Sequence, residues 1–192
     1  MAFASPTMGF GASSGQNFNP NKDVELASPP TDGISSLSWS PVANYIVATS
    51  WDKEVRCWEV QPNGQSQPKA MVTHTQPVLC SDWSADGTTV FAGDCDRAVF
   101  TWNLQTNQHT KVAEHAAPVR HLRFIKEMNL LVTGSWDKTL KYWDLRTPNP
   151  VHTHTLPERC YALDCSHPLL VVGTADRHIQ IFNLANPQVC RV

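Results

Sequence analysis

The sequence of 192 residues contains no apolar run that approaches a membrane span, which takes roughly 18 residues. Its N-terminal residues lack the basic region and the apolar core of a secretory signal. Charge is also scarce, because 17 % of the residues are charged and the formal net charge is −2. A chain of this kind has no overall electrostatic attraction to nucleic acid or anionic membranes. These absences predict a nuclear or cytoplasmic protein with no membrane span.

Cysteine is present, but the chain has no CxxC pair and no dense disulfide framework. Four of the six cysteines fall inside apolar runs, which predicts buried free thiols in a reducing compartment. His152 and His154 alternate on one predicted strand, but no further ligand follows at zinc-site spacing. A glycine-rich phosphate loop and a carboxylate pair in an active-site setting are also missing. We therefore expect no metal, no cofactor and no enzymatic activity.

The beginning of the chain differs in composition from the rest. Residues 1–21 are rich in Ser, Gly, Asn, Phe and Pro without periodicity, which predicts a disordered tail. Within it, Met8–Gly11 resembles phenylalanine–glycine nucleoporin sequence. Residues 22–27 alternate and predict a lone strand, and a turn follows at 28–32.

A repeat begins at Ile34 and organises the remaining chain. Four corner aspartates lie 44, 41 and 39 residues apart, and an aromatic residue follows each of them by six positions. An alternating run that predicts a strand precedes each corner, at 34–40, 78–84, 119–125 and 160–166. The aspartates are Asp52, Asp96, Asp137 and Asp176, and the aromatics are Trp58, Trp102, Trp143 and Phe182.

A period of about 40 residues with several short strands in each unit is typical of a β-propeller blade. Four unrelated hairpins would not share the aspartate-to-aromatic offset. The predicted fold is therefore all-β, a β-propeller with blades at approximately 33–72, 73–113, 114–155 and 156–192. Each blade is expected to be a twisted antiparallel sheet that packs face to face with its neighbours.

The third unit predicts the internal wiring of a blade. We expect Asp137 to accept from His115, His115 to meet Ser135, and Ser135 to meet the indole of Trp143. Ser, His and Asp are also the side chains of a nucleophilic triad, which needs an exposed serine and an oxyanion hole. Because the motif recurs at blade spacing beside a tryptophan, we interpret it as structural.

The other units depart from this pattern. The second unit has His74, Asp96 and Trp102, but Asp94 takes the serine position, which predicts altered wiring. The first unit has no histidine before its strand, and the fourth unit has Phe182 in place of tryptophan. We expect these two blades to depend more on packing; their network residues are Ser50, Asp52 and Trp58, and Thr174 and Asp176.

Function is expected on the rim that carries the corner turns. The residue before each aspartate points outward there, and Trp51 and Trp136 occupy two of these positions. Exposed tryptophan is a common hot-spot anchor, although both rings can also lean back over the turn. Arg120, Arg159 and Tyr161 lie near the starts of first strands and are predicted to join the same rim. This combination suits a peptide or protein segment.

A nucleic-acid interface would need a basic stripe. The sequence predicts a modest basic cluster, confined to the third unit, of Lys126, Lys138, Lys141 and Arg146.

The repeats resemble the WD-repeat family, through Ser135–Asp137, Trp143–Asp144, His74 and His115. Within that family, 55–60, 133–141 and 156–161 are similar to the mRNA export factors of the nuclear pore, and so is the Phe/Gly/Ser-rich start. The resemblance covers essentially the whole chain. The Ser-Trp-Asp motifs are shared with the kinetochore propellers of the mitotic checkpoint and do not separate the two groups.

The resemblance implies a seven-bladed, non-enzymatic propeller at the nuclear envelope and pore, and also in the cytoplasm. It implies docking on a phenylalanine–glycine nucleoporin through a GLEBS-type hairpin at the rim positions Trp51, Trp136, Arg159 and Tyr161. It further implies a role in exporting poly(A)+ mRNA, with contacts to mRNA or ribonucleoprotein, and a second role with mitotic spindle proteins. The alternatives are a mitotic-checkpoint scaffold and a substrate-receptor propeller of ubiquitin ligases.

Four repeats do not close a seven-bladed ring, so the resemblance implies an open, incomplete ring for this chain. In the family, an N-terminal strand pairs with the last blade, and residues 22–27 are expected to supply that ring-closing strand.

Overall fold

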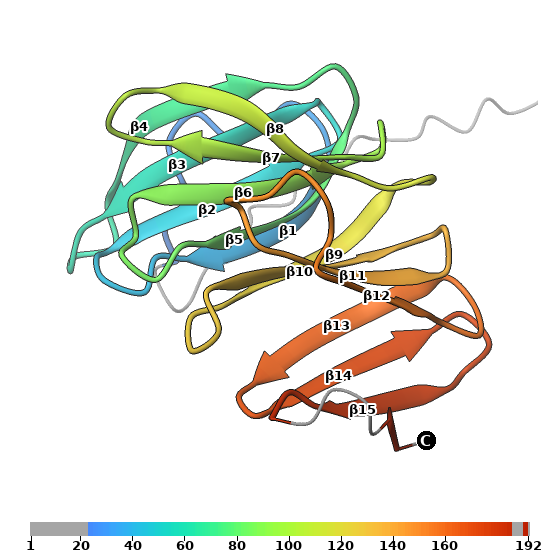
Figure 1. The fold of residues 1–192 in the computed structure, drawn as a ribbon. Helices are drawn as coiled ribbons and strands as arrows, with labels where there is room; N and C mark the ends of the chain where they lie inside the picture. Colours follow the sequence, from blue (N-terminus) through green and yellow to red (C-terminus); the bar gives the residue numbers. More distant parts are fainter. Residues whose placement is uncertain (1–22, 186–189, 192) are drawn as a thin grey trace, which may run out of the picture.

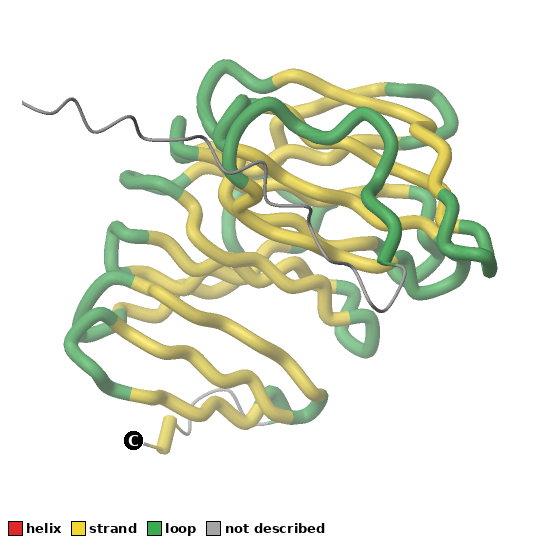
Figure 2. Tube along the Cα trace, turned by 180° about the vertical axis from the view of Figure 1, so that it is seen from behind, coloured by secondary structure: helices red, strands yellow, loops and turns green. Residues whose placement is uncertain are grey.

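The fold was analysed in a computed structural model that describes residues 23–185 and the backbone of 190–191. The predicted disordered tail at 1–21 lies outside the described residues. Within the described part, strands are joined by loops and no helix is present (Figure 2). No helix there is long and apolar enough to cross a membrane.

The described residues form sixteen strands in four separate antiparallel sheets, which follow one another along the chain (Figure 1). The first sheet contains β1 (Ile34–Trp39), β2 (Tyr45–Ser50), β3 (Glu54–Val60) and β4 (Ser66–Thr73). The second contains β5 (Val78–Trp83), β6 (Thr89–Asp94), β7 (Ala98–Asn103) and β8 (Gln108–Glu114). The third contains β9 (Val119–Ile125), β10 (Leu130–Ser135), β11 (Thr139–Trp143) and β12 (His152–Thr155). The fourth contains β13 (Cys160–Ser166), β14 (Leu169–Thr174), β15 (Ile179–Asn183) and β16 (Cys190–Arg191).

Each sheet is a propeller blade with its strands in sequence order. The first strands β1, β5, β9 and β13 contact one another from blade to blade and lie innermost. One apolar core fills each junction between neighbouring blades, because alternate residues on each strand face the adjacent sheet. Trp58 and Trp102 are among the largest fully buried side chains. The prediction of an all-β, open propeller of four blades is confirmed.

The two end blades keep one uncovered face each. Leu37 and Trp39 on β1 are 61 % and 57 % exposed, and Ile179 on β15 is 62 % exposed. The four sheets therefore form an arc rather than a closed ring (Figure 1).

Asp23–Ala27 form no strand, although the sequence predicts a ring-closing strand at 22–27. This segment instead follows the outer side of the first blade, where the Trp58 indole donates to the Ala27 carbonyl at 2.6 Å and Ser66 Oγ accepts from the Ala27 N–H at 2.9 Å. The backbone N–H and carbonyl of Ala27 therefore already have hydrogen-bond partners and need none from a neighbouring strand.

All cysteines whose side chains are described are free thiols. Cys57, Cys80 and Cys160 are buried, and burial raises the pKa of Cys57 to about 11 and those of Cys80 and Cys160 to about 12. These thiols are therefore packing groups rather than nucleophiles.

Candidate interaction rim

The corner rim consists of the turns at 51–53, 95–97, 136–138 and 175–178 together with the loops that join successive blades. In the third blade, Asp137 Oδ1 accepts from the N–H of Thr139 at 2.9 Å, which closes the turn from inside. The residue after each corner aspartate has a positive φ, between 64° and 75°, although none is glycine. These residues are Lys53, Arg97, Lys138 and Arg177.

The third blade holds a continuous chain of hydrogen bonds below its corner. The Trp143 indole donates to Thr133 Oγ1 at 2.8 Å, and the Thr133 hydroxyl lies 2.7 Å from His115 Nε2. His115 Nδ1 lies 2.9 Å from Asp137 Oδ2, so the carboxylate fixes the tautomer with the proton on Nδ1. The predicted partnership of His115 and Asp137 is present.

The prediction that Ser135 links His115 to Trp143 is wrong, because Thr133 does so. Trp143 pairs with Leu131 across the β10–β11 ladder, which places Ser135 further along the strand from the indole than Thr133. Ser135 Oγ instead donates toward the carbonyls of Ala117 and Pro118, 2.9 Å from each, and accepts from the Asp137 N–H. Ser135 is fully buried and ties the corner to the preceding loop.

Protonation in this network follows from burial and hydrogen bonding. Burial opposes ionisation of Asp137, but donors from His115, Thr139 and the Ala116 N–H outweigh it and hold its pKa far below the ordinary value. Burial lowers the pKa of His115, and Asp137 offsets only part of that effect. At neutral pH the pair is therefore a carboxylate and a neutral imidazole.

The second blade is wired differently, as the sequence predicts. His74 Nδ1 lies 3.1 Å from Asp94 Oδ2, and both side chains are fully buried. Among the described residues, the corner residue Asp96 accepts a side-chain hydrogen bond from Thr75 Oγ1 alone, at 3.3 Å. His74 Nε2 has no hydrogen-bond partner among the described residues. Ala92 occupies the position of Thr133 and offers no hydroxyl.

Aromatic packing replaces the missing hydrogen bonds in the second blade. The ring centroid of His109 lies 4.6 Å from that of His74 and 4.4 Å from that of Phe100, which stacks on it. The Trp102 indole turns to Asn107 Oδ1, 2.9 Å away. The sequence reasoning missed this cluster, although a second histidine on the outer strand was a visible signal.

The first and fourth blades satisfy their corners by other means. Asp52 accepts from the N–H groups of Thr31 at 2.8 Å and Glu54 at 3.0 Å, in a blade without a histidine. In the fourth blade, Asp176 accepts from Thr174 and lies 2.7 Å from His178 Nδ1. His178 follows its aspartate rather than preceding it, and the sequence reasoning missed it for that reason.

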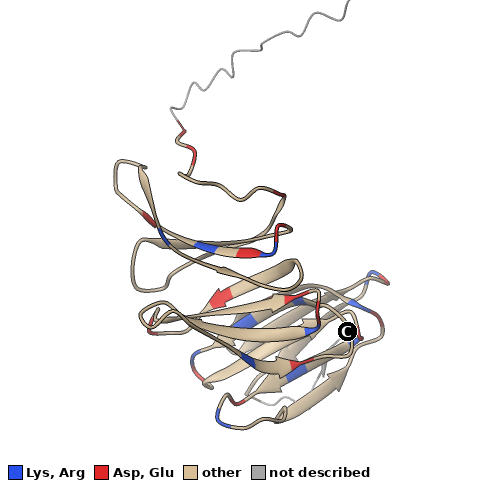
Figure 3. Ribbon diagram, turned by 90° about the horizontal axis from the view of Figure 1, so that it is seen from above, with Lys and Arg blue, Asp and Glu red and all other residues tan. Residues whose placement is uncertain are grey.

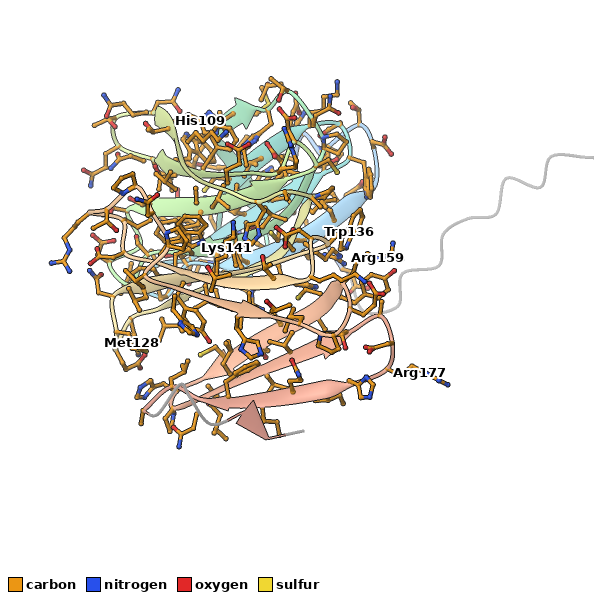
Figure 4. All side chains as sticks on the ribbon, turned by 45° about the vertical axis from the view of Figure 1, so that its right-hand side comes forward. His109, Met128, Trp136, Lys141, Arg159 and Arg177 are labelled. Atoms are coloured by element: carbon orange, nitrogen blue, oxygen red, sulfur yellow. The ribbon has the colours of Figure 1, made fainter. Side chains whose placement is uncertain are left out.

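The two rim tryptophans have different environments. Trp51 is 47 % exposed, whereas Trp136 is half-buried and its indole N–H is enclosed without an acceptor among the described residues. Arg159 is exposed, and its carbonyl accepts from the N–H of Ala175 in the fourth corner. Trp136, Arg159 and Arg177 lie at one end of the sheets, and Met128 lies at the other end (Figure 4).

Two further predicted rim residues lie on inner strands. Tyr161 is 49 % exposed on β13, and its carbonyl lies 2.7 Å from His121 Nε2 on β9. Arg120 is half-buried and donates to the carbonyl of Leu79, 3.4 Å away on the preceding blade. Tyr161 thus remains accessible, whereas Arg120 bridges two blades.

The predicted basic cluster of the third unit does not form one surface. Lys126 and Arg146 lie on loops at the end opposite the corner rim, while Lys138 lies in a corner turn and pairs with Glu158 at 3.0 Å. Lys141 donates to the Glu114 carbonyl on the preceding blade. Basic and acidic segments alternate over the molecule (Figure 3). The basic residues that do recur on one rim are those at the positive-φ turn positions.

No group of three or more described His, Cys, Asp or Glu side chains is arranged to hold a metal ion. His152 and His154 lie on the outer strand β12 against Tyr142 and Phe182, respectively.

Repeated four-stranded blades with an aspartate corner and a buried aromatic define a WD-repeat β-propeller. The profile of the WD domain, G-beta repeat matches residues 24–59, 66–103 and 106–144, and the chain belongs to this family. It is 53 % identical over 169 residues to the poly(A)+ RNA export protein of Schizosaccharomyces pombe, covering 86 % of this chain and 48 % of that protein.

Two further relatives carry related names. The chain is 49 % identical over 182 residues to the protein Rae1 of Drosophila melanogaster, covering 92 % of this chain and 52 % of the relative. It is 48 % identical over 182 residues to the mRNA export factor of Xenopus tropicalis, covering 92 % and 50 %. The resemblance to mRNA export factors is thereby confirmed, and the chain spans about half the length of these relatives.

Solved structures support the fold alone. The structure of U3-55K superposes with a TM-score of 0.78 at 21 % identity, covering 88 % of this chain and 54 % of that one. The crystal structure of the computationally designed Ika4 protein superposes with a TM-score of 0.70 at 23 % identity, covering 83 % and 96 %.

Proposed function

We propose that this chain is a non-enzymatic adaptor of poly(A)+ mRNA export that docks on a phenylalanine–glycine nucleoporin at the nuclear pore. The observation that carries the proposal is the corner rim, where exposed Trp51 and Arg159 accompany half-buried Trp136 and accessible Tyr161. The names of relatives that are about 50 % identical to this chain support a role in mRNA export.

The chemistry of the rim suits a partner segment that presents acidic and apolar side chains. The positive-φ positions project a cation from every blade, and Lys53 and Arg177 have no described ion pair. Trp51 offers a large apolar face beside Gly33, whose built Cβ would lie 3.6 Å from the ring. Aromatic anchors within a charged border are the usual composition of a binding hot spot.

The test is recovery of nucleoporin by the full-length protein carrying Trp51→Ala and Trp136→Ala. We expect recovery to fall at least tenfold, since removing two hot-spot anchors costs about 2 kcal/mol or more. Val151→Ala is the matched control, because Val151 is 53 % exposed in the loop 144–151 on the opposite rim. Equal recovery by the double variant and the wild type would disprove the rim assignment.

The same experiment separates the alternatives. Checkpoint kinases recovered without nucleoporin would favour a mitotic-checkpoint scaffold, and ubiquitin-ligase subunits would favour a substrate receptor. Spindle proteins recovered together with nucleoporin would support the second, mitotic role. The adaptor is expected in the nucleus, at the nuclear envelope and in the cytoplasm.

Direct RNA binding is a second candidate, favoured by the cations of the corner turns. Phosphate contacts release counterions, so binding through these residues must weaken steeply as salt rises. A titration of poly(A) RNA at several salt concentrations tests this, with Lys53→Gln plus Arg177→Gln as the variant. Absence of binding at low salt would eliminate direct contact.

A further inference from the structure

Three clefts open at the rim opposite the corners, one at each junction between blades. The cleft between the first and second blades has a volume of about 470 Å³, the next about 360 Å³ and the third about 190 Å³. Met128, which lines the third cleft, lies at the end of the molecule opposite Trp136 (Figure 4). We call these clefts the junction sockets.

The junction sockets are built from equivalent repeat positions. A leucine from the following blade forms one wall of each, two residues after the buried aromatic of that blade. These leucines are Leu104, Leu145 and Leu184. The sockets are therefore a recurring product of the blade geometry rather than three accidental hollows.

The opposite wall is a cross-strand pair on the outer strands of the preceding blade. The pairs are Cys57 with Ala70, Thr101 with Thr110, and Tyr142 with His152. The lining of the sockets is almost uncharged: Lys69 and Asp86 border the first, Asp86 the second, and none of the residues around the third carries a fixed charge. Such sockets suit uncharged, partly apolar side chains.

The chain enters the described structure on the first blade, on the sheet face that carries Trp58 and not on the face whose Cys57 lines the first socket. A Cβ built on Gly64, in the turn between β3 and β4, would lie 3.6 Å from Val24 Cγ2. That turn lies on the rim opposite the corners, and from it the segment runs up to Thr31, which donates to the corner residue Asp52. Residues 1–22, outside the described residues, are therefore attached at the rim that carries the sockets.

The composition of this attached segment matches the sockets. Residues 1–21 contain no Asp, Glu, Lys or Arg, and their aromatic residues are three phenylalanines at intervals of seven and eight residues. These are Phe3, Phe10 and Phe18. At about 3.3 Å per extended residue, 22 residues reach about 70 Å from the attachment point, enough to pass several junctions.

We propose that residues 1–22 dock along this rim and that their phenylalanines occupy the junction sockets of the same molecule. Phe18, nearest the attachment point, takes the first socket beside Tyr45, and Phe10 and Phe3 take the next two in order. Tethering supplies a high effective concentration, so weak individual contacts suffice. An aromatic ring covers the apolar surface of Val42, which is 61 % exposed at the first socket.

Hydrogen–deuterium exchange of the full chain tests the proposal. We compare the wild type with the variant Phe3→Ala, Phe10→Ala, Phe18→Ala, and follow the loops 104–107 and 144–151 beside the sockets. The expected result is several-fold faster exchange of these loops in the variant, with no change in the corner turns 51–53 and 136–138. Gln16→Ala with Asn17→Ala is the matched control, since it changes the same segment but keeps every phenylalanine.

A second variant addresses the socket. Val151→Lys places a charge at the third socket, and Val151 is 53 % exposed, so the fold should tolerate it. Exchange of loop 144–151 is expected to accelerate in this variant while loop 104–107 stays protected. Identical exchange in the wild type and the triple phenylalanine variant would overturn the proposal. Protection that rises with protein concentration would also overturn it, because the occupant would then be the segment of another copy.

Discussion

The second and third blades solve the same packing problem with different chemistry. In the third blade, Thr133 joins the Trp143 indole to the His115–Asp137 pair. Every polar side-chain atom that takes part in this network has a hydrogen-bond partner. In the second blade, Ala92 replaces the threonine, and His74 pairs with Asp94 instead of the corner aspartate. A single missing hydroxyl therefore separates a hydrogen-bonded interior from one filled by stacked rings.

The difference shows which part of the repeat is indispensable. Both blades keep a three-residue corner turn with a positive φ, at Arg97 and at Lys138, although only Asp137 accepts from a histidine. The turn therefore does not depend on the buried network. The network instead determines how the outer strands are held against the interior of the blade.

The largest effect should come from removing the hydroxyl that the second blade lacks. Thr133→Val leaves the Trp143 N–H and His115 Nε2 buried without partners, and each such group costs about 1–3 kcal/mol. We expect the free energy of unfolding to fall by about 2–5 kcal/mol, measured by urea denaturation. Thr101→Val, whose hydroxyl donates to the Thr110 carbonyl at the surface, is the control and should change stability by less than about 0.5 kcal/mol. Similar losses for both would mean that the network is not a major source of stability.

The sequence predicted the fold well because the aspartate-to-aromatic offset is local to one hairpin. Asp137 lies in the turn between β10 and β11, and Trp143 ends β11, so the spacing of the two residues reports the length of that strand directly. Thr133 and Ser135 lie on the same face of one strand, and only the ladder register, with Leu131 opposite Trp143, decides between them. That register is not visible in the spacing of the motif.

The candidate site was predicted only in part, for a similar reason. The place before a corner aspartate predicted an outward side chain, and this agrees with exposed Trp51 but not with half-buried Trp136. The basic residue after each corner aspartate was also visible in the sequence. Only the structure shows that these four residues lie on one rim and have a positive φ. The prediction of a basic cluster in the third unit was wrong, because residues that are close in sequence lie at opposite ends of the blade.

A smaller effect should follow from replacing an aspartate of the second blade by asparagine. Asp94→Asn removes the buried carboxylate from His74, and losing a hydrogen bond to a charged group costs about 1.5–3 kcal/mol. Asp96→Asn is the matched change at the exposed corner and should cost less than about 0.5 kcal/mol. In the third blade the order reverses, with Asp137→Asn the damaging change. Urea denaturation of the three variants measures this, and equal costs for Asp94→Asn and Asp96→Asn would contradict the described wiring.

The smallest effect concerns acid sensitivity of the stacked cluster. Burial, followed by the neighbouring His74, lowers the pKa of His109 from 6.5 to about 4, and Asp94 only partly opposes this. The unfolded chain takes up this proton near pH 6.5, whereas the folded chain resists until about pH 4. The contribution of His109 to the free energy of unfolding is therefore fully present above pH 6.5, and it is lost as the pH falls from 6.5 toward 4.

Thermal unfolding between pH 7 and pH 4 measures this contribution. His109→Gln should flatten the decline of the melting temperature, because its side chain takes up no proton in either state. His121→Gln is the matched variant in the third blade, where burial likewise lowers the pKa to about 4. An unchanged pH profile in His109→Gln would show that the second blade does not exclude the proton.

The lengths of the loops reveal where this architecture accepts change. On the corner rim, three of the four turns have three residues, and each loop between blades has four. On the opposite rim, the loops range from two residues at His167–Pro168 to eight at Asp144–Val151. The differences in loop length between the repeats are therefore concentrated on the rim opposite the corners. A new segment is therefore best grafted into the loops of the opposite rim, where the repeats already differ most in length.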